Sequence, residues 1–244
     1  MGELFAVLSG KGGTGKTSVC AGIATALAEC GKKVLCIDCD VGLGNLDISL
    51  GVSAMGALTF ADICGGNYCM QQALQHPEYP GLYLLAAPAT GSVDQVDADL
   101  FRQLLHHGRQ GYDFVLLDAP AGVEAGFRLA ARFADRILLV AGPDPGSLRD
   151  AHRAAQLLEQ MDKTQIRLVV NRISKGLARK VDLTVDDIMD KVGLPLIGVV
   201  PEDKNVTLAA SCDQPLLSFT TKGAAAACSR IARRLCGYSV PIPL

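Results

Sequence analysis

The chain has 244 residues, of which 49% are hydrophobic and 20% are charged, and this composition excludes disordered and coiled-coil chains. Lys and Arg together number 23 and Asp and Glu 25, so the net charge of −2 argues against a protein that coats nucleic acid. Aromatic residues make up only 5%, so we expect an aliphatic core within a single domain that spans residues 1–244.

We expect no targeting signal at the N-terminus. Met1-Gly2-Glu3 leads directly into the apolar run Leu4–Leu8, without the basic start and long apolar region of a signal peptide. No stretch reaches the roughly 18 consecutive apolar residues that a membrane span requires. The sequence therefore predicts a cytoplasmic chain, in which the nine cysteines are reduced thiols.

Short, continuous apolar runs recur along the chain. They lack strict alternation of polar and apolar residues, which is typical of strands buried on both faces. The runs are Leu4–Leu8, Lys33–Ile37, Leu82–Ala87, Phe114–Leu117, Ile137–Val140, Leu168–Val170 and Leu196–Val200.

Segments with helical spacing lie between these runs. The clearest contains Val19, Ile23 and Leu27 and ends before Gly31. The others lie near Asp97–His107, Gly122–Phe133, Ser147–Met161, Val185–Val192 and Gly223–Leu235. Strands that alternate with helices predict an α/β fold with a doubly wound, mostly parallel sheet of about seven strands and helices on both faces.

A glycine-rich segment follows the first predicted strand and precedes the first helix. It matches the pattern G-x-x-x-x-G-K-[ST], whose backbone N–H groups face phosphate oxygens. We expect Lys16 to supply a charge for the phosphates and Thr17 a hydroxyl for Mg²⁺. The predicted ATP-binding residues here are Gly10, Lys11, Gly12, Gly13, Thr14, Gly15, Lys16, Thr17 and Ser18.

The same letters also fit a dinucleotide-binding fingerprint. Gly10, Gly12 and Gly15 spell G-x-G-x-x-G, and Asp38 ends the next strand. Two features disfavour this alternative: a dinucleotide has no need of Lys16 and Thr17, and a second strand ends in an acid. The sequence therefore favours a P-loop NTPase that binds ATP.

Two strand ends carry acidic residues. Asp40 follows the second strand, and Asp118 ends the strand that contains Phe114–Leu117. Ligands of open α/β sheets lie beyond the carboxyl ends of the strands, so both carboxylates should face the phosphate loop. Thr17, Asp40 and Asp118 are the predicted Mg²⁺ ligands, the carboxylates through water. Asp40 is also predicted to orient the attacking water, and capping of the next helix is the alternative role of either aspartate.

Several segments carry a resemblance to a known family. Lys11–Thr17 is a phosphate loop with an extra lysine near its start, Asp38–Asp47 reads DCDVGLGNLD, and Pro120–Phe127 reads PAGVEAGF. These segments resemble the phosphate loop and the two switches of the MinD/ParA ATPases, with the switches nearest to the MinD branch. Leu148–Asp150, Val169–Arg172 and Val200–Asp203 follow in the order of that family.

The resemblance implies a homodimer that closes around two ATP molecules. Lys11 would then reach the phosphates of the partner's ATP and would act with Lys16 and Asp40 as a catalytic residue. The resemblance also assigns contacts with the adenine base to Asn171, Pro201, Glu202 and Asp203, and Arg172 is a further predicted ATP-binding residue. From the sequence alone, Asn171 is equally well explained as a turn residue at a strand end.

The chain departs from the family in three places. Residues 237–244 contain two prolines and cannot form the amphipathic membrane helix that ends MinD. Ala141–Pro145 and His152 replace residues that the family usually carries on its partner surface. A MinC-like or activator partner, and a peripheral position at the inner face of the membrane, are therefore left open. DNA is not expected as a partner.

The remaining cysteines, histidines and basic residues are assigned to structural roles. Cys36 and Cys39 lie three apart on a strand and should point to opposite faces, whereas Cys64 and Cys69 could meet across a loop. Cys228 and Cys236 lie ~12 Å apart on a helix, too far for one metal ion or disulfide. His76, His106, His107 and His152 are expected at the surface, as is the basic cluster of Arg172, Lys175, Arg179 and Lys180.

These expectations combine into an ATP-dependent dimerisation switch that hydrolyses ATP slowly without a partner. Spatial regulation of cell division is the expected output. A related ATPase that positions flagella, DNA or other cargo is one alternative. A metallochaperone or iron–sulfur carrier of the same fold, with Cys64 and Cys69 as its candidate ligands, is the other.

Overall fold

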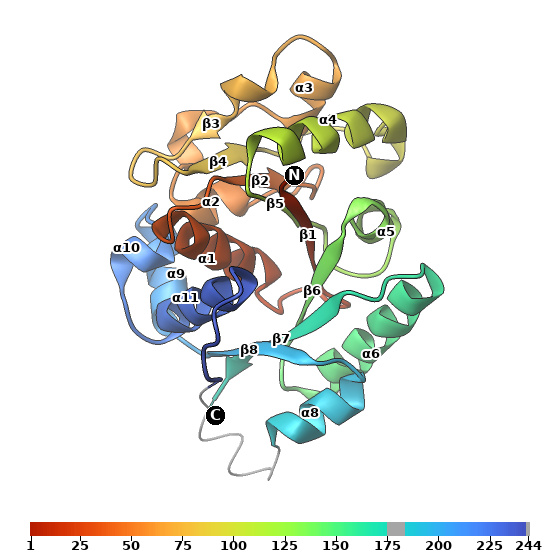
Figure 1. Ribbon diagram of the computed structural model, residues 1–244, viewed down its shortest axis with the longest axis vertical. Coiled ribbons are helices and arrows are strands. Elements are labelled where there is room, and N and C mark those ends of the chain that lie inside the picture. The colour runs from red at the N-terminus through yellow and green to blue at the C-terminus, as the bar shows by residue number, and fades with distance from the viewer. Residues whose placement is uncertain (175–183, 243–244) are drawn as a thin grey trace.

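The computed structural model describes residues 1–174 and 184–242 and centres on an eight-stranded sheet (Figure 1). The strand order is β3-β4-β2-β5-β1-β6-β7-β8, and every neighbouring pair is parallel except β3 and β4. The strands are β1 (Glu3–Leu8), β2 (Val34–Asp38), β3 (Leu74–Gln75), β4 (Leu82–Leu85), β5 (Phe114–Asp118), β6 (Arg136–Ala141), β7 (Ile166–Ile173) and β8 (Leu196–Pro201).

Helices cover both faces of the sheet. They are α1 (Lys16–Glu29), α2 (Leu46–Leu50), α3 (Phe60–Cys64), α4 (Ala98–Gly111), α5 (Ala125–Phe133), α6 (Pro145–Gln160), α8 (Val185–Val192), α9 (Lys204–Ser211), α10 (Leu216–Phe219) and α11 (Ala224–Leu235). None of the helices within the described ranges is long and apolar enough to span a bilayer. The expected doubly wound α/β fold is confirmed.

Two hydrophobic cores lie on opposite faces of the sheet. Leu4, Ala6 and Leu8 of β1 face the core shared with α4, α5, α6 and α8, whereas Phe5 and Val7 face the core shared with α1 and α11. Successive side chains of a strand point to opposite faces, so a continuous apolar run can supply both cores. All seven predicted strands are present for this reason.

The structure adds an eighth strand and several short helices to the prediction. β3 has two residues and pairs antiparallel with β4 at the edge of the sheet. α2, α3 and α10 have five, five and four residues, so none of them repeats an apolar face often enough to produce a helical pattern. α9, with eight residues, was also not predicted and begins at the capping carboxylate of Asp203.

Cys36 and Cys39 lie on opposite sides of the sheet, as predicted, because each belongs to a different core. The expectation of a surface position is wrong for His76, which is only 4% exposed. Its Nε2 lies 2.8 Å from the carbonyl oxygen of Leu50, and its Nδ1 accepts the N–H groups of Glu78 and Tyr79. This histidine is buried because it joins two backbone segments that are distant in sequence.

His106, His107 and His152 are exposed, and all nine cysteines are free thiols. Of the predicted basic cluster, Lys175, Arg179 and Lys180 lie outside the described residues. After α11 the chain continues without a helix to Ile242. Arg234 fixes this segment by donating hydrogen bonds to the carbonyl oxygens of Val240 and Pro241, at 2.9 and 2.6 Å, and to that of Ile197 in β8 at 2.8 Å.

Candidate functional site

The glycine-rich loop lies at the carboxyl end of β1, between β5 and β6. At β1 the order in which the chain adds strands to the sheet changes direction. The crevice formed at such a point is the usual ligand site of open α/β sheets. Gly13 and Gly15 adopt φ angles of +77° and +82°, which L side chains rarely reach. A Cβ at Gly15 would also collide with the amide nitrogen of Asn171, so the loop requires glycine at this position.

The N-terminus of α1 is open to an anion. No side chain caps it, and its first turn contains no acidic residue. Its unpaired N–H groups and the positive end of the helix dipole therefore remain available to a phosphate. Within the described residues, the hydroxyl oxygen of Thr14 is buried and has no hydrogen-bond partner. A buried polar atom of this kind calls for a ligand atom, so the loop fits a phosphate group.

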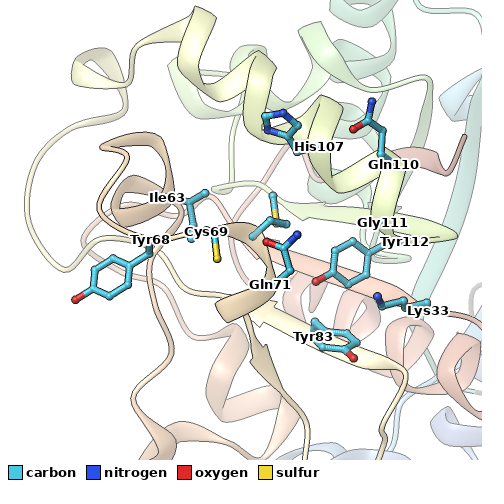
Figure 2. Close-up of a pocket in the computed structure, with 11 residues that line it drawn as sticks. Lys33, Ile63, Tyr68, Cys69, Gln71, Tyr83, His107, Gln110, Gly111 and Tyr112 are labelled. Atoms are coloured by element: carbon cyan, nitrogen blue, oxygen red, sulfur yellow. The ribbon is translucent and has the colours of Figure 1, made fainter.

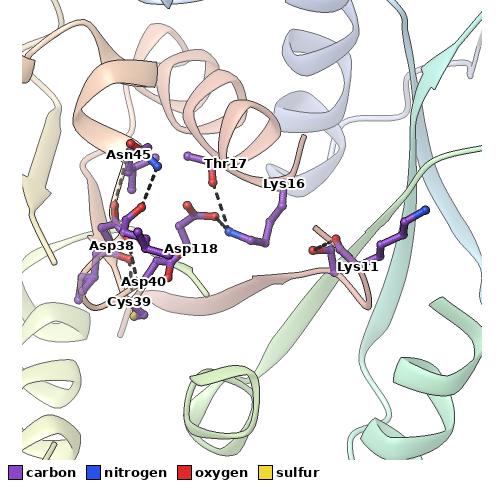
Figure 3. Close-up of polar contacts among 12 residues, drawn as sticks. Lys11, Lys16, Thr17, Asp38, Cys39, Asp40, Asn45 and Asp118 are labelled. Carbon is purple, nitrogen blue, oxygen red and sulfur yellow. Dashed lines mark hydrogen bonds and ion pairs between the residues drawn. The ribbon is translucent and has the colours of Figure 1, made fainter. Parts of the chain in front are cut away.

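Lys16 and Asp118 form a buried ion pair beside the loop. Lys16 Nζ lies 2.6 Å from Asp118 Oδ1, and the two side chains are 6% and 2% exposed. The same ammonium lies 3.3 Å from the hydroxyl oxygen of Thr17 (Figure 3). The structure thus brings together three predicted site residues that come from α1 and β5.

Burial raises the pKa of the Asp118 carboxyl, and the nearby charge of Lys16 and hydrogen bonds from Lys16 and Thr17 oppose this rise. Burial and the negative charge of Asp118 also raise the pKa of Asp38, to about 6. These two carboxyls end neighbouring strands and are paired in the sheet register. The acidic edge of the sheet therefore favours a cation, whose charge would stabilise both ionised carboxylates.

Asp38 has a structural role here that the sequence analysis did not identify. Its two carboxylate oxygens accept the backbone N–H groups of Asp40 and Leu46, at 2.9 and 3.0 Å. It thereby fixes both ends of the loop that carries Asp40, and Figure 3 shows Asp38 close to Asp40. The Asp-x-Asp spacing after a strand was the available signal, because a buried strand-end acid often binds the backbone that follows it.

Asp40 is partly exposed, and its charge contributes to raising the pKa of Asp118. It therefore lies on the same edge as Lys16, Thr17 and Asp118. Within the described residues, no group of three His, Cys, Asp or Glu side chains could by itself hold a metal ion. Two carboxylates and a hydroxyl beside a phosphate loop instead suit a hard cation that takes its other ligands from phosphate and water.

Lys11 lies apart from the Lys16–Asp118 pair. Its side chain is 49% exposed and points away from that pair (Figure 3), and its ammonium lies 3.6 Å from Asp144 Oδ1. Asp144 also caps α6 by accepting the N–H of Ser147 at 2.9 Å. In this arrangement, Lys11 is available at the surface rather than directed at the phosphate loop of its own chain.

A cavity of about 520 Å³ adjoins the loop, a volume typical of small-ligand sites. Its walls contain the five predicted ATP-binding residues that lie outside the loop, together with residues of the loop and α1. They include Gly13, Gly15, Ser18, Asn171, Arg172, Pro201, Glu202 and Asp203. The structure therefore gathers the segments that the family resemblance assigned to one nucleotide. The side of the cavity formed by α9 and α10, including Val206 and Leu216, was missed because neither helix was predicted.

Two of these residues hold the phosphate loop from the strand β7. Asn171 is buried and donates its amide N–H to the carbonyl oxygen of Thr14 at 2.7 Å. Arg172 has a φ of +62° and donates to the carbonyl oxygen of Gly13 at 2.7 Å. Asp203 joins α9 and α11, since its carboxylate accepts the N–H groups of Asn205 and Ala224 at 2.9 and 3.0 Å.

Comparison with known proteins agrees with the nucleotide site described above. A family model for the "CobQ/CobB/MinD/ParA nucleotide binding domain" matches residues 5–216. The septum site-determining protein MinD of Synechocystis sp. is 36% identical over 246 aligned positions, which cover 99% of this chain and 92% of the relative.

Two solved structures extend this similarity to three dimensions. A chain of the MinC:MinD cell division protein complex of Aquifex aeolicus has a TM-score of 0.91 at 36% identity, covering 99% of this chain and 98% of that one. The septum site-determining protein MinD of Pyrococcus horikoshii, complexed with Mg-ADP, has a TM-score of 0.83 at 27% identity and covers 96% of both chains.

Proposed function

Because the chain belongs to the MinD/ParA family of nucleotide-binding proteins, we propose that it is a MinD-like ATPase that acts in septum-site placement. The observation that carries the proposal is the uncapped phosphate loop with its buried, unpartnered Thr14 hydroxyl, next to a cavity of nucleotide size. ATP fits this site in charge and in size, since the loop offers N–H groups and the ammonium of Lys16.

The site residues divide into four proposed roles. The loop residues 10–18 bind the phosphates of ATP through backbone N–H groups, with Lys16 as the cation that neutralises their charge. Thr17, Asp40 and Asp118 hold Mg²⁺, which stabilises negative charge on the phosphates. Asp40, placed by the bonds of Asp38 to the following backbone, orients the attacking water. Asn171, Arg172 and the stretch 201–203 surround the base.

The proposed switch is an ATP-dependent homodimer. Lys11 supports this idea because its ammonium is exposed and paired only loosely, at 3.6 Å, with the exposed carboxylate of Asp144. An exposed pair of this kind contributes little free energy, so Lys11 can leave it for a stronger anion. In the dimer, Lys11 binds the phosphates of the partner's ATP and completes the charge stabilisation for hydrolysis. Hydrolysis is accordingly slow in the monomer.

A MinC-like protein is the proposed partner, since the Aquifex relative was solved as a MinC:MinD complex. Asp144 and His152 lie at the start and on the exposed face of α6, so they are the positions at which partner recognition would differ from that of relatives.

Size-exclusion chromatography tests the switch. Wild type and Asp40→Ala are compared with ATP, with ADP and without nucleotide, because a variant that binds but does not hydrolyse ATP should accumulate the dimer. Phosphate release is measured for wild type, Lys16→Ala and the control Lys32→Ala. Lys32 precedes β2 and so lies at the amino ends of the strands, away from the phosphate loop. We expect an ATP-dependent dimer of Asp40→Ala and loss of phosphate release in Lys16→Ala alone.

Two results would overturn the proposal: a monomeric Asp40→Ala in the presence of ATP, or phosphate release that survives in Lys16→Ala. Co-sedimentation of the same samples with anionic liposomes and with DNA separates membrane contact from DNA contact. Chelation of Mg²⁺ should abolish phosphate release. The carboxylates of Asp40 and Asp118 would then face the phosphates without a neutralising ion.

A further inference from the structure

A second cavity, of about 810 Å³, opens at the amino ends of β2 and β5, whereas the phosphate loop lies at the carboxyl ends of the strands. Its walls come from the residues that precede β2 and β5, from β4, from the segment after α3 and from the end of α4 (Figure 2). It shares no residue with the cavity beside the phosphate loop. The proposed ATPase activity makes no use of it.

The backbone of Lys33 is firmly placed at this cavity. Its N–H donates to Asp113 Oδ2 at 2.8 Å, and its carbonyl oxygen accepts the N–H groups of Asp113 and Phe114, at 2.7 and 3.2 Å. The carboxylate of Asp113 is thus bound to the backbone of Lys33. Among the residues that the structure describes, no carboxylate lies within ion-pair distance of the Lys33 ammonium.

The ammonium of Lys33 instead lies over two tyrosine rings. Its Nζ is 4.8 Å from the ring centroid of Tyr112 and 5.3 Å from that of Tyr83. The two rings meet edge to face, with centroids 5.2 Å apart and an angle of 71° between their planes. Lys33 is exposed, and cation–π attraction favours this position of its charge over free rotation into solvent. Such preorganisation reduces the entropy lost on binding.

The rest of the wall contains no carboxylate, lysine or arginine but includes His107 and several groups that can form hydrogen bonds. Burial raises the pKa of Tyr112 to about 12, so its phenol is neutral at physiological pH and can donate a hydrogen bond. Gln71 and Gln110 add amide groups, and Met70 adds an apolar surface. Figure 2 shows Gln71 and Lys33 directed toward the space beside Tyr112.

We propose that this cavity binds a small organic monoanion that consists of an aromatic ring system and one carboxylate. The carboxylate pairs with the Lys33 ammonium, and the ring packs against Tyr83 and Met70. A ligand with one negative charge is preferred to a phosphate dianion because Lys33 is the one lysine or arginine among the lining residues, and because the carboxyl end of α4 at Gly111 disfavours additional negative charge. Aromatic surfaces add attraction beyond simple burial of area.

Equilibrium dialysis with 2-naphthoate tests the proposal directly. The cation 2-naphthylmethylamine has the same ring and the opposite charge, so it should bind at least tenfold more weakly. Lys33→Met should weaken 2-naphthoate binding at least tenfold, since it removes the charge and keeps the length of the side chain. Lys32→Met is the matched control, because Lys32 is adjacent in sequence but does not line this cavity, and it should stay within twofold of wild type.

A second variant obstructs the cavity without changing any charge. Gly111 lines the wall, and a Cβ there would meet no atom within 4 Å, so the first atom of a side chain is accommodated without a clash. Gly111→Phe should therefore weaken 2-naphthoate binding at least tenfold while the thermal unfolding temperature stays close to that of wild type.

Alkylation by iodoacetamide locates the bound probe. Cys69 lines the cavity and is exposed, whereas Cys30 and Cys212 are exposed elsewhere. Bound 2-naphthoate should slow alkylation of Cys69 and leave the other two thiols unchanged, as read by mass spectrometry. Saturating ADP should not displace the bound 2-naphthoate. Failure of this proposal is therefore distinguishable from failure of the proposed ATPase function.

Four results would overturn the proposal. These are the absence of saturable binding up to about 1 mM, equal binding of the amine, full binding by Lys33→Met, and competition by ADP with no protection of Cys69.

Discussion

The buried pair of Lys16 and Asp118 makes a strong prediction about the protein without nucleotide. Asp118→Asn keeps the size of the side chain but removes the charge 2.6 Å from the Lys16 ammonium. Both side chains are less than a tenth exposed, so water cannot replace the lost carboxylate. Removing one partner of a buried pair destabilises a protein by about 3–5 kcal/mol. We expect the free energy of unfolding to fall by that amount.

Urea unfolding in the absence of nucleotide measures this change. With a slope of about 2–3 kcal/mol per M, the midpoint should fall by roughly 1–2.5 M. Asp99→Asn is the control, because Asp99 pairs with Arg102 at 2.9 Å but the two side chains are 76% and 64% exposed. Breaking that exposed pair should change the free energy of unfolding by less than about 1 kcal/mol.

A double-mutant cycle separates the ion pair from other effects of the substitution. Lys16→Met should destabilise less than Asp118→Asn, because burial already raises the pKa of Asp118 and an unpaired carboxyl can take up a proton. The double variant should be more stable than Asp118→Asn, with a coupling energy of about 2–3 kcal/mol. A midpoint for Asp118→Asn within experimental error of wild type, or additive single effects, would refute the reasoning.

Three further predictions concern the loop, the acidic edge and the C-terminal segment. The pKa of Asp38 in the folded protein, about 6, exceeds its ordinary value of 3.8. The stability gained by its protonation is therefore complete below pH 3.8 and is lost as the pH rises through 6. Urea titrations between pH 4 and 7 should show a fall of about 3 kcal/mol in the free energy of unfolding, and Asp38→Asn should lack this fall. Gly15→Ala should abolish ADP binding in calorimetry because its φ is +82° and its Cβ would strike Asn171, whereas Gly12→Ala, whose Cβ meets its nearest atom at 3.9 Å, should bind within a few-fold of wild type. Arg234→Met removes three hydrogen bonds to carbonyl oxygens and should make the final segment more sensitive to chymotrypsin, with a loss of about 1–2 kcal/mol in stability; equal cleavage of the two proteins would contradict this.

The features that were predictable from the sequence depend on local patterns. The strand β1, the glycine-rich loop and α1 are consecutive, and each is marked by its own residues: an apolar run, glycines with Lys16, and an apolar helix. The position of Asp118 followed from a general rule of parallel sheets, because the carboxyl ends of neighbouring strands meet at one edge. The position of Asn171 beside the nucleotide cavity was predictable only from the family resemblance.

The features that were missed depend on contacts between distant segments. Asp38 shapes the loop that carries Asp40 because its carboxylate meets two N–H groups, one of them eight residues away. His76 is buried because it bonds to Leu50, 26 residues earlier. β3 exists only as a partner of β4. No periodicity in the sequence encodes such pairings, since each is decided by where the chain places two segments in space.

The bond between Lys16 and Asp118 also determines what an arriving nucleotide encounters. The protein carries the counterion of its own loop lysine, so the loop does not project a bare positive field into solution. A phosphate must displace a carboxylate rather than water, and the exchange leaves the charge at Lys16 balanced before and after binding. Binding at this loop should therefore depend less on ionic strength than binding to an exposed lysine would, and its selectivity arises from shape and hydrogen bonding at short range.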